Sequence, residues 1–248
     1  MDLDNPIAKG NTAKIYHADN KIIKIYNDFL TDAESLNEAK KQEYAYSCGL
    51  PVPKVIDVTK INGKQAMIME YIRGETLGNL MFLNNGKVEH YLSISVDIQM
   101  KIHSIKPNQE AIESMNIKLN RQIETATIIT KKQKTDLLHK MSSITFENRL
   151  CHGDFHLYNL IKTGCQVVVI DWMDSSMGDI HADVYRTYLL YSQLSMELAD
   201  VYLRLYCDKS GISRSDVFQW APVIAGARLS EHVSTERTER LMEIVNHY

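Results

Sequence analysis

One stretch of the sequence, residues 149–174, constrains the fold and the chemistry more than any other. It contains a compact polar loop, His-Gly-Asp at 152–154, and Asn159 follows five positions after the Asp. A run of β-branched apolar residues at 167–170 is long enough for one buried strand. That strand delivers Asp171 at its end. We therefore expect two short strands around a polar loop, closed by an acidic turn.

The residue types in this stretch are those that phosphoryl transfer needs. A hydroxyl nucleophile needs a carboxylate that orients it and accepts its proton, and nucleotide phosphates need a divalent metal held by hard oxygen ligands. Asp154 is the candidate base, and Asn159 and Asp171 are the candidate metal ligands. Gly153 gives the loop the backbone freedom to aim Asp154 into a cleft.

Two other interpretations of the stretch compete with catalysis. A lone Asp or Asn before a strand is often a turn former, but two acids and an Asn that flank one buried strand favour catalysis. His152, Asp154 and His156 also alternate like the zinc ligands of a metal hydrolase. Nothing nearby completes such a ligand set, and a hydrolase leaves the N-terminal half of the chain without explanation.

The stretch resembles the catalytic segment of the aminoglycoside phosphotransferase and choline kinase family, which reads HGD-x-x-x-x-N with a downstream I-D-W. The matching residues are His152, Gly153, Asp154, His156, Asn159, Ile170, Asp171 and Trp172. The chain departs from the family at Leu157-Tyr158, where many relatives carry Pro-Gly, but the ligand types are intact.

The resemblance implies a bilobal protein-kinase-like fold of the α+β class. Residues 1–70 would form a small N-terminal nucleotide-binding lobe, an antiparallel sheet with one helix. Residues 71–248 would form a larger, mostly helical catalytic and acceptor-binding lobe. The implied reaction moves the γ-phosphoryl group of ATP or GTP, with Mg²⁺, to a hydroxyl of a small molecule such as an aminoglycoside, a choline-like amino alcohol or a sugar.

Local signals in the N-terminal part predict hairpins and one helix. Asp19-Asn20 is a hairpin turn signal within residues 7–26, and Asn62-Gly63 is a stronger one between strands at 54–60 and 65–70. Thr31, with Glu34 three residues on, predicts a helix from Thr31 to Ser47 that Gly49 ends.

The resemblance assigns nucleotide-binding roles within these elements. The turn Gly10-Asn11-Thr12 would cover the phosphates, although its single glycine is a weak signal. Lys24 would grip the phosphates and pair with Glu38, with Glu43 as the alternative partner. The backbone of Glu70, Tyr71 and Ile72 would contact the base, as the hinge segment does in kinase-like folds.

After the proposed hinge, the spacing of the apolar residues becomes that of amphipathic helices. The predicted helices are Val88–Ile105, one or two within 109–141 with a break at Lys131–Lys134, Asp183–Leu194, 196–209, 214–229 and 235–247. His103 is interpreted as a packed or capping residue. Asp183 is expected to start its helix and to brace the catalytic loop by hydrogen bonds.

The last helices are expected to cover the acceptor side of the site. Tyrosines at helical spacing are interpreted as core residues, namely Tyr185, Tyr188, Tyr191, Tyr202 and Tyr206. Candidates for contacts with polar groups of the acceptor are Arg228, Glu231, His232, Glu236 and Glu239.

Composition excludes several classes of function. With 44% hydrophobic and 24% charged residues among 248, the chain has an ordinary globular composition, and its net charge of −3 argues against nucleic-acid binding. It has no apolar run of membrane-spanning length, and its polar start is unlike a signal peptide. Its four cysteines form no C-x-x-C pair, which fits a reducing cytoplasm. We expect a cytoplasmic enzyme with a small-molecule partner and no membrane or nucleic-acid partner.

Two further functions remain as alternatives. A nucleotide-binding regulatory module that has lost catalysis would explain the sparse glycine turn, but the intact Asp154, Asn159 and Asp171 argue against it. A protein kinase is disfavoured because the chain lacks an A-P-E motif and room for a long activation segment. The sequence leaves open the acceptor, the choice between ATP and GTP, and the oligomeric state.

Overall fold

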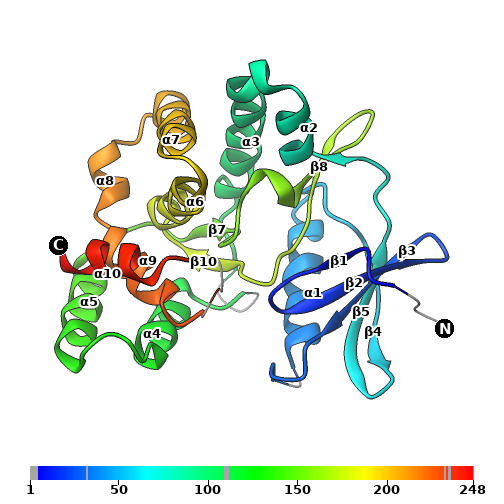
Figure 1. The fold of residues 1–248 in the computed structure, drawn as a ribbon, viewed down its shortest axis with the longest axis horizontal. Coiled ribbons are helices and arrows are strands. Elements are labelled where there is room, and N and C mark those ends of the chain that lie inside the picture. Colours follow the sequence, from blue (N-terminus) through cyan, green and yellow to red (C-terminus); the bar gives the residue numbers. More distant parts are fainter. Residues whose placement is uncertain (1–4, 32, 109–111, 232, 234–235, 248) are drawn as a thin grey trace. The chain divides into compact units, whose positions relative to one another are not determined.

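The computed structural model describes residues 5–31, 33–108, 112–231, 233 and 236–247. The chain forms two compact units: the first unit comprises residues 1–83 and 157–174, and the second comprises 84–156 and 175–248. Residues 157–174 thus group with the N-terminal part of the chain. Figure 1 labels most of the helices and strands of both units.

The first unit contains a five-stranded antiparallel sheet. Its order is β1-β2-β3-β5-β4, with β1 Ala8–Lys9, β2 Ala13–Ala18, β3 Lys21–Tyr26, β4 Val55–Ile61 and β5 Lys64–Glu70. The two predicted hairpin turns are present: φ is 49° at Asp19, 58° at Asn20, 51° at Asn62 and 79° at Gly63. Such positive φ values at two successive residues give a turn whose twist matches the flanking strands.

One helix, α1 (Glu34–Ser47), packs on β4 and β5. The prediction that it begins at Thr31 was wrong: the helix begins at Glu34, and the Thr31 Oγ1 hydroxyl donates to the Glu34 side chain at Oε1 (2.8 Å). Its end was predicted correctly: Gly49 adopts φ 80°, a conformation that favours glycine.

A second, three-stranded sheet completes the first unit. Its order is β6-β8-β9, with β6 Glu75–Thr76, β8 Leu160–Lys162 and β9 Val167–Val169, next to α2 (Leu77–Leu83) and the 3₁₀ turn η2 (Leu157–Asn159). The Val169 amide donates to the Pro51 carbonyl (2.8 Å), which ties β9 to the segment between α1 and β4. The predicted buried strand is thus confirmed except for its last residue. The β8–β9 turn carries an exposed free cysteine, Cys165.

The second unit is mostly helical. Its helices are η1 Asn85–Lys87, α3 Val88–His103, α4 Met115–Thr125, α5 Lys131–Ser143, α6 Ile180–Leu194, α7 Met196–Ser210, α8 Arg214–Phe218, α9 Ala221–Arg228 and α10 Thr238–Asn246. One antiparallel strand pair, β7 (Arg149–Cys151) with β10 (Ser176–Gly178), lies among them. The five tyrosines predicted as core residues are all buried. Within the described residues, no helix combines the length and apolarity needed to cross a membrane.

Two helix starts in this unit differ from prediction for the same reason. Lys131–Lys134 is the first turn of α5 and not a break, because Thr130 caps the helix and Gln133 completes the capping box. Helix α6 begins before Asp183, because the Asp179 side chain accepts from the His181 amide (3.0 Å) and caps it. A side-chain cap upstream decided both boundaries.

The last predicted helices also need correction. Residues 214–229 form two helices, α8 and α9, with Pro222 in the first turn of α9, where its missing N–H group costs no helical hydrogen bond. Helix α10 begins at Thr238 and not at 235, a residue that lies outside the described part of the chain.

Candidate active site

In the first unit, one buried ammonium group lies between two carboxylates. Lys24 Nζ on β3 donates to Glu38 Oε1 on α1 (2.7 Å) and to Asp171 Oδ1 after β9 (2.8 Å). The Tyr26 hydroxyl donates to the other oxygen of Glu38 (2.7 Å). The alternative partner, Glu43, is exposed. The structure therefore joins three predicted site residues, Lys24, Glu38 and Asp171, in one cluster.

Burial and charge oppose each other in this cluster. Burial alone would lower the pKa of Lys24, but Asp171 and Glu38 outweigh it and hold that pKa above its usual value. Burial has the opposite effect on a carboxyl group and raises the pKa of Glu38, and the nearby Lys24 ammonium group partly offsets this rise. Since one ammonium group faces two carboxylates, the cluster retains surplus negative charge, which suits a site for a cation.

The two candidate metal ligands lie at the same end of the β8–β9 hairpin. Leu160 pairs with Val169, and the Ile170 amide donates to the Asn159 carbonyl (3.0 Å). Asn159 thus precedes β8 where Asp171 follows β9. Asp171 has φ 61°, unusual for a residue other than glycine, and this turn aims its carboxylate at Lys24. An amide and a carboxylate oxygen are donors that Mg²⁺ prefers.

The other predicted nucleotide contacts belong to exposed or half-buried backbone of the first unit. Gly10, Asn11 and Thr12 form the turn between β1 and β2, closed by a hydrogen bond from the Gly10 amide to the Ala13 carbonyl (2.9 Å). Of the proposed hinge residues, Glu70 already donates its amide to the Lys54 carbonyl (2.9 Å). Tyr71 and Ile72 follow the strand and are half-buried.

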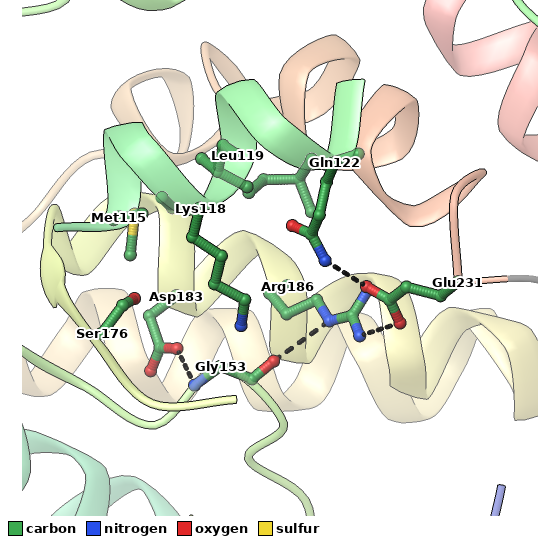
Figure 2. Close-up of a pocket in the computed structure, with 12 residues that line it drawn as sticks. Met115, Lys118, Leu119, Gln122, Gly153, Ser176, Asp183, Arg186 and Glu231 are labelled. Carbon is green, nitrogen blue, oxygen red and sulfur yellow. Dashed lines mark hydrogen bonds and ion pairs between the residues drawn. The ribbon is translucent and has the colours of Figure 1, made fainter. Parts of the chain in front are cut away.

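The candidate base, Asp154, belongs to the second unit, in the loop after β7. Gly153, directly before it, adopts φ 82° and is held at both backbone polar groups. Its amide donates to Asp183 Oδ1 on α6 (2.7 Å), and its carbonyl accepts from Arg186 Nε on the same helix (3.1 Å) (Figure 2). The prediction that Asp183 braces the loop is confirmed. Arg186 was not predicted.

Neighbouring side chains lower the pKa of Asp154. His156 Nε2 lies 3.5 Å from Asp154 Oδ2. Burial alone would raise the pKa of Asp154, but His156, with further contributions from Arg186 and His152, holds it well below its usual range. Asp154 is therefore a carboxylate at neutral pH, able to accept a hydrogen bond from a hydroxyl group.

A buried network of hydrogen bonds holds the Asp183 carboxylate in place. Its second oxygen accepts from His103 Nε2 (2.9 Å) and Gln99 Nε2 (3.1 Å), and the Tyr206 hydroxyl is hydrogen-bonded to His103 Nδ1 (2.6 Å). Burial would raise the pKa of Asp183, but these hydrogen bonds lower it from 3.8 to about 2. His103 is thus a packed residue, as predicted.

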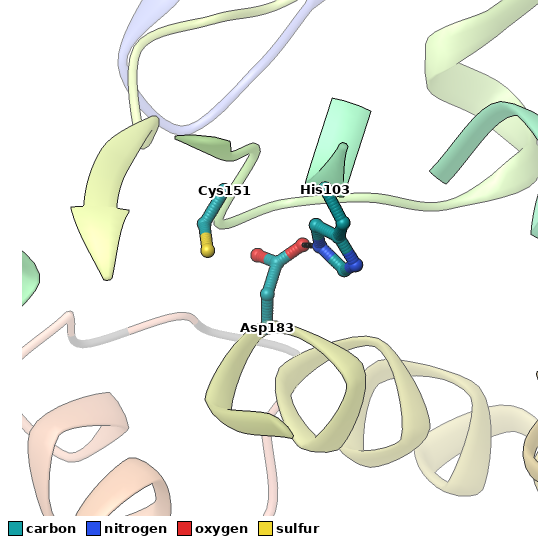
Figure 3. A group of neighbouring side chains, drawn as sticks. All are labelled: His103, Cys151 and Asp183. Carbon is teal, nitrogen blue, oxygen red and sulfur yellow. Dashed lines mark hydrogen bonds and ion pairs between the residues drawn. The ribbon is translucent and has the colours of Figure 1, made fainter. Parts of the chain in front are cut away.

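Among the described residues, one group of three His, Cys or acidic side chains has its possible metal-ligand atoms close together, and two of its members belong to this network. Donor atoms of His103, Cys151 and Asp183 lie within 4.8 Å of one another (Figure 3). Burial raises the pKa of the Cys151 thiol well above its usual value, and both oxygens of Asp183 already accept hydrogen bonds. The group is a hydrogen-bonded support and not a metal centre. The zinc interpretation of the catalytic stretch gains no ligand set.

A small hollow of about 30 Å³ lies beside Gly153 in the second unit. Among its lining residues are Lys118 and Gln122 on α4, Arg186 on α6 and Glu231 after α9 (Figure 2). Of the residues predicted to meet the acceptor, Glu231 lines this hollow, whereas Arg228 and Glu236 bind each other. Glu239 lies in the first turn of α10, and His232 lies outside the described residues.

Comparisons with known proteins agree with this geometry. Residues 5–218 match the phosphotransferase enzyme family. The chain is 27% identical over 211 residues to the Protein LicA homolog of Mycoplasma capricolum subsp. capricolum, covering 82% of this chain and 79% of that protein.

Solved structures share the fold at low sequence identity. A thermostable mutant of aminoglycoside phosphotransferase APH(4)-Ia, in a ternary complex with AMP-PNP and hygromycin B, superposes with a TM-score of 0.66 at 13% identity, covering 98% of this chain and 92% of that one. A choline/ethanolamine kinase family protein from Mesorhizobium loti superposes with a TM-score of 0.64 at 14% identity, covering 97% and 85%. The fold is therefore protein-kinase-like, and the chain belongs to the phosphotransferase enzyme family.

Proposed function

We propose that the protein transfers the γ-phosphoryl group of ATP to a hydroxyl group of a small molecule. The observation that carries this proposal is the buried cluster of Lys24 with Glu38 and Asp171. An ammonium group held by a helix carboxylate is the device that positions nucleotide phosphates in kinase-like enzymes. Its second partner, Asp171, is a candidate metal ligand, so the cluster joins phosphate binding to metal binding.

The residues present fit Mg²⁺. Asn159 and Asp171 are hard oxygen donors at one end of a hairpin, and the surplus negative charge around Lys24 favours a divalent cation. When bound, Mg²⁺ neutralises charge on the nucleotide phosphates. The turn Gly10-Asn11-Thr12 and the backbone of Tyr71 and Ile72 complete the proposed nucleotide site.

Asp154 is the proposed catalytic carboxylate. Because its pKa lies well below its usual range, it is a weak base at neutral pH. Its main contribution is therefore to orient the acceptor hydroxyl by accepting a hydrogen bond. It takes the proton late, once bonding to phosphorus has made the hydroxyl acidic.

The polar lining beside Gly153 favours an acceptor rich in hydroxyl groups over a quaternary ammonium alcohol. Recognition of a quaternary ammonium group relies on aromatic faces. No aromatic ring is among the described residues that line the hollow beside Gly153. Lys118 and Ser176 instead carry polar groups of the kind that bind hydroxyl oxygens.

The test is Mg²⁺-dependent transfer of phosphate from ATP to a panel of sugars, aminoglycosides, homoserine, choline and ethanolamine. We expect at least one polyhydroxylated acceptor to be phosphorylated and choline to be inactive. In Asp154→Asn, kcat should fall by about 10²–10⁴-fold while the Kd for Mg-ATP stays within about 3-fold.

Each outcome of this test separates two possibilities. Near-full activity in Asp154→Asn would remove Asp154 from the mechanism. Tight binding of Mg-ATP without transfer to any acceptor would favour the regulatory module. Phosphorylation of choline alone would overturn the proposed acceptor class and leave the reaction standing.

A further inference from the structure

A line of alternating charges runs through the second unit and ends at the catalytic loop. Arg186 Nε donates to the Gly153 carbonyl (3.1 Å), and Arg186 Nη2 donates to Glu231 Oε2 (2.8 Å) (Figure 2). Glu231 also accepts from Gln122 Nε2 on α4 (3.3 Å). The Arg186 side chain is only 8% exposed. The backbone next to Asp154 is thus joined through Arg186 to Glu231, a residue 45 positions beyond Arg186 in the chain.

The line continues to the last described helix. Arg228 on α9 donates to Glu231 Oε2 and, through Nε, to Glu236 Oε2 (3.1 Å). The other oxygen of Glu236 accepts from Arg240 Nη1 on α10 (3.1 Å), and Arg240 Nη2 donates to the Leu189 carbonyl on α6 (3.0 Å). We call this set of five residues, Arg186, Glu231, Arg228, Glu236 and Arg240, the charge ladder.

Stability alone is a poor explanation for the charge ladder. The Arg228 and Glu236 side chains are only 7% and 5% exposed, so burying them costs several kcal/mol of desolvation per ion. Well-packed apolar residues often replace buried ion pairs at no loss of stability. A carboxylate partner can fix the orientation of a planar guanidinium group, and an apolar side chain cannot.

The orientation of the Arg186 guanidinium group matters because it holds the backbone of Gly153. Gly153 adopts φ 82°, and glycine has more backbone freedom than any other residue. The Gly153 carbonyl belongs to the peptide group that leads into Asp154, so rotation of this peptide group would displace the carboxylate. Asp183 holds the amide of Gly153, but only Arg186 holds its carbonyl among the contacts described above.

We propose that Arg186 is a positioning residue for phosphoryl transfer, that it fixes the Gly153–Asp154 peptide group so that Asp154 meets the acceptor hydroxyl, and that the rest of the charge ladder holds Arg186 in place. This inference rests on the proposed function. It extends the site from the catalytic loop to α10, whose Arg240 would influence the rate without touching a substrate.

The test compares variants along the charge ladder by steady-state kinetics with the best acceptor. We expect Arg186→Met to lower kcat by about 10²-fold, the loss typical of a catalytic group displaced by about 1 Å. The KM for ATP should stay within about 3-fold, because the proposed nucleotide residues lie in the first unit. Arg186→Lys should recover part of kcat, since an ammonium group can reach one partner but lacks the guanidinium fork.

Effects should weaken with distance from Gly153. Glu231→Gln, which keeps the shape and removes the charge, should lower kcat by about 10-fold, and Glu236→Gln by about 3-fold. The matched control is Arg204→Met on α7, which loses an exposed ion pair with Glu89 (2.9 Å) and should keep the wild-type kcat.

Chemical rescue separates positioning from folding. In Arg186→Ala, added methylguanidinium should restore part of kcat, whereas Arg204→Ala should show no response. If Arg186→Met does not fold, Arg186→Lys and Glu236→Gln give the same comparison.

The charge ladder and the proposed function fail in distinguishable ways. An active wild type whose folded Arg186→Met and Glu231→Gln variants keep kcat within about 3-fold would overturn the positioning role alone. A wild type that transfers phosphate to no acceptor would overturn the proposed function and the positioning role together.

Discussion

The two units hold their own candidate functional residues in different ways. In the first unit, side chains bind each other directly: Lys24 lies within 2.8 Å of oxygens of both Glu38 and Asp171. In the second unit, the described supports hold the backbone of Gly153, through Asp183 and Arg186. The first arrangement couples buried charges, whereas the second fixes a peptide from which Asp154 projects. Damage to the first should therefore cost stability and nucleotide affinity, and damage to the second should cost stability and rate.

The largest effect is expected in the first unit. Lys24→Met leaves Glu38 buried without its cation and should lower the free energy of unfolding by about 3–5 kcal/mol, as other broken buried ion pairs do. It should also weaken Mg-ATP binding, because the phosphates lose their ammonium partner. Urea unfolding and calorimetric titration measure the two losses.

Two controls sharpen this prediction. Lys24→Met combined with Glu38→Gln should be more stable than Lys24→Met alone, because it leaves no unpaired charge on α1. Lys64→Met breaks an exposed pair with Asp28 (2.6 Å) and should unfold like the wild type. If the double variant is no more stable than Lys24→Met alone, the unpaired Glu38 carboxylate is not the cause of the lost stability.

The second prediction concerns the pH dependence of stability in the second unit. The folded-state pKa of Asp183 is about 2, below the 3.8 of an unperturbed Asp, so the unfolded chain binds more protons in this window. The resulting stabilisation is complete above about pH 4, is lost as pH falls toward 2, and amounts to about 2 kcal/mol.

Asp183→Asn tests this sign. The difference in unfolding free energy between wild type and variant should be largest at pH 5–7 and shrink as the pH falls below 4. Urea unfolding at pH values from 7 to 3 measures it. A difference that stays constant over this range would show that the hydrogen bonds of Asp183 do not depend on its charge.

The smallest effect on stability, with a distinct effect on rate, is expected at Gly153. An alanine at φ 82° costs about 1–2 kcal/mol, and Gly153→Ala should also lower kcat because the peptide before Asp154 must rotate. Gly211→Ala is the matched control: it has φ 79°, and no atom lies within 4 Å of an added Cβ. Both variants should lose similar stability, but only Gly153→Ala should lose kcat. If the two variants have the same kcat, the backbone of Gly153 does not position Asp154.

The sequence predicted what is encoded locally. The Asp19-Asn20 and Asn62-Gly63 turns need only residues that tolerate positive φ, and both form. The pairing of Lys24 with Glu38 followed from the resemblance and is present. Helix starts were less predictable, because a cap one to four residues upstream decides them, as Thr130 and Asp179 do here.

The support of the catalytic loop was harder to predict because its parts are far apart in the chain. Arg186 lies 33 positions from Gly153 and 45 from Glu231, and no local pattern marks such a contact. Arg228, Glu231 and Glu236 were predicted as acceptor contacts because they are polar residues of the last helices, but in the structure their charges meet Arg186 and one another. Only the tertiary structure shows that these charges satisfy each other.

The β8–β9 turn offers a practical handle on the first unit. Of the four free cysteines, Cys165 is the exposed one, whereas Cys151 is buried with a raised pKa and Cys48 and Cys207 are partly covered. Thiol reagents react with accessible thiolates, so a maleimide dye should attach first at Cys165. That position lies in the hairpin that begins after Asn159 and ends before Asp171. The native chain thus carries its own attachment point for a fluorescent reporter of metal and nucleotide binding.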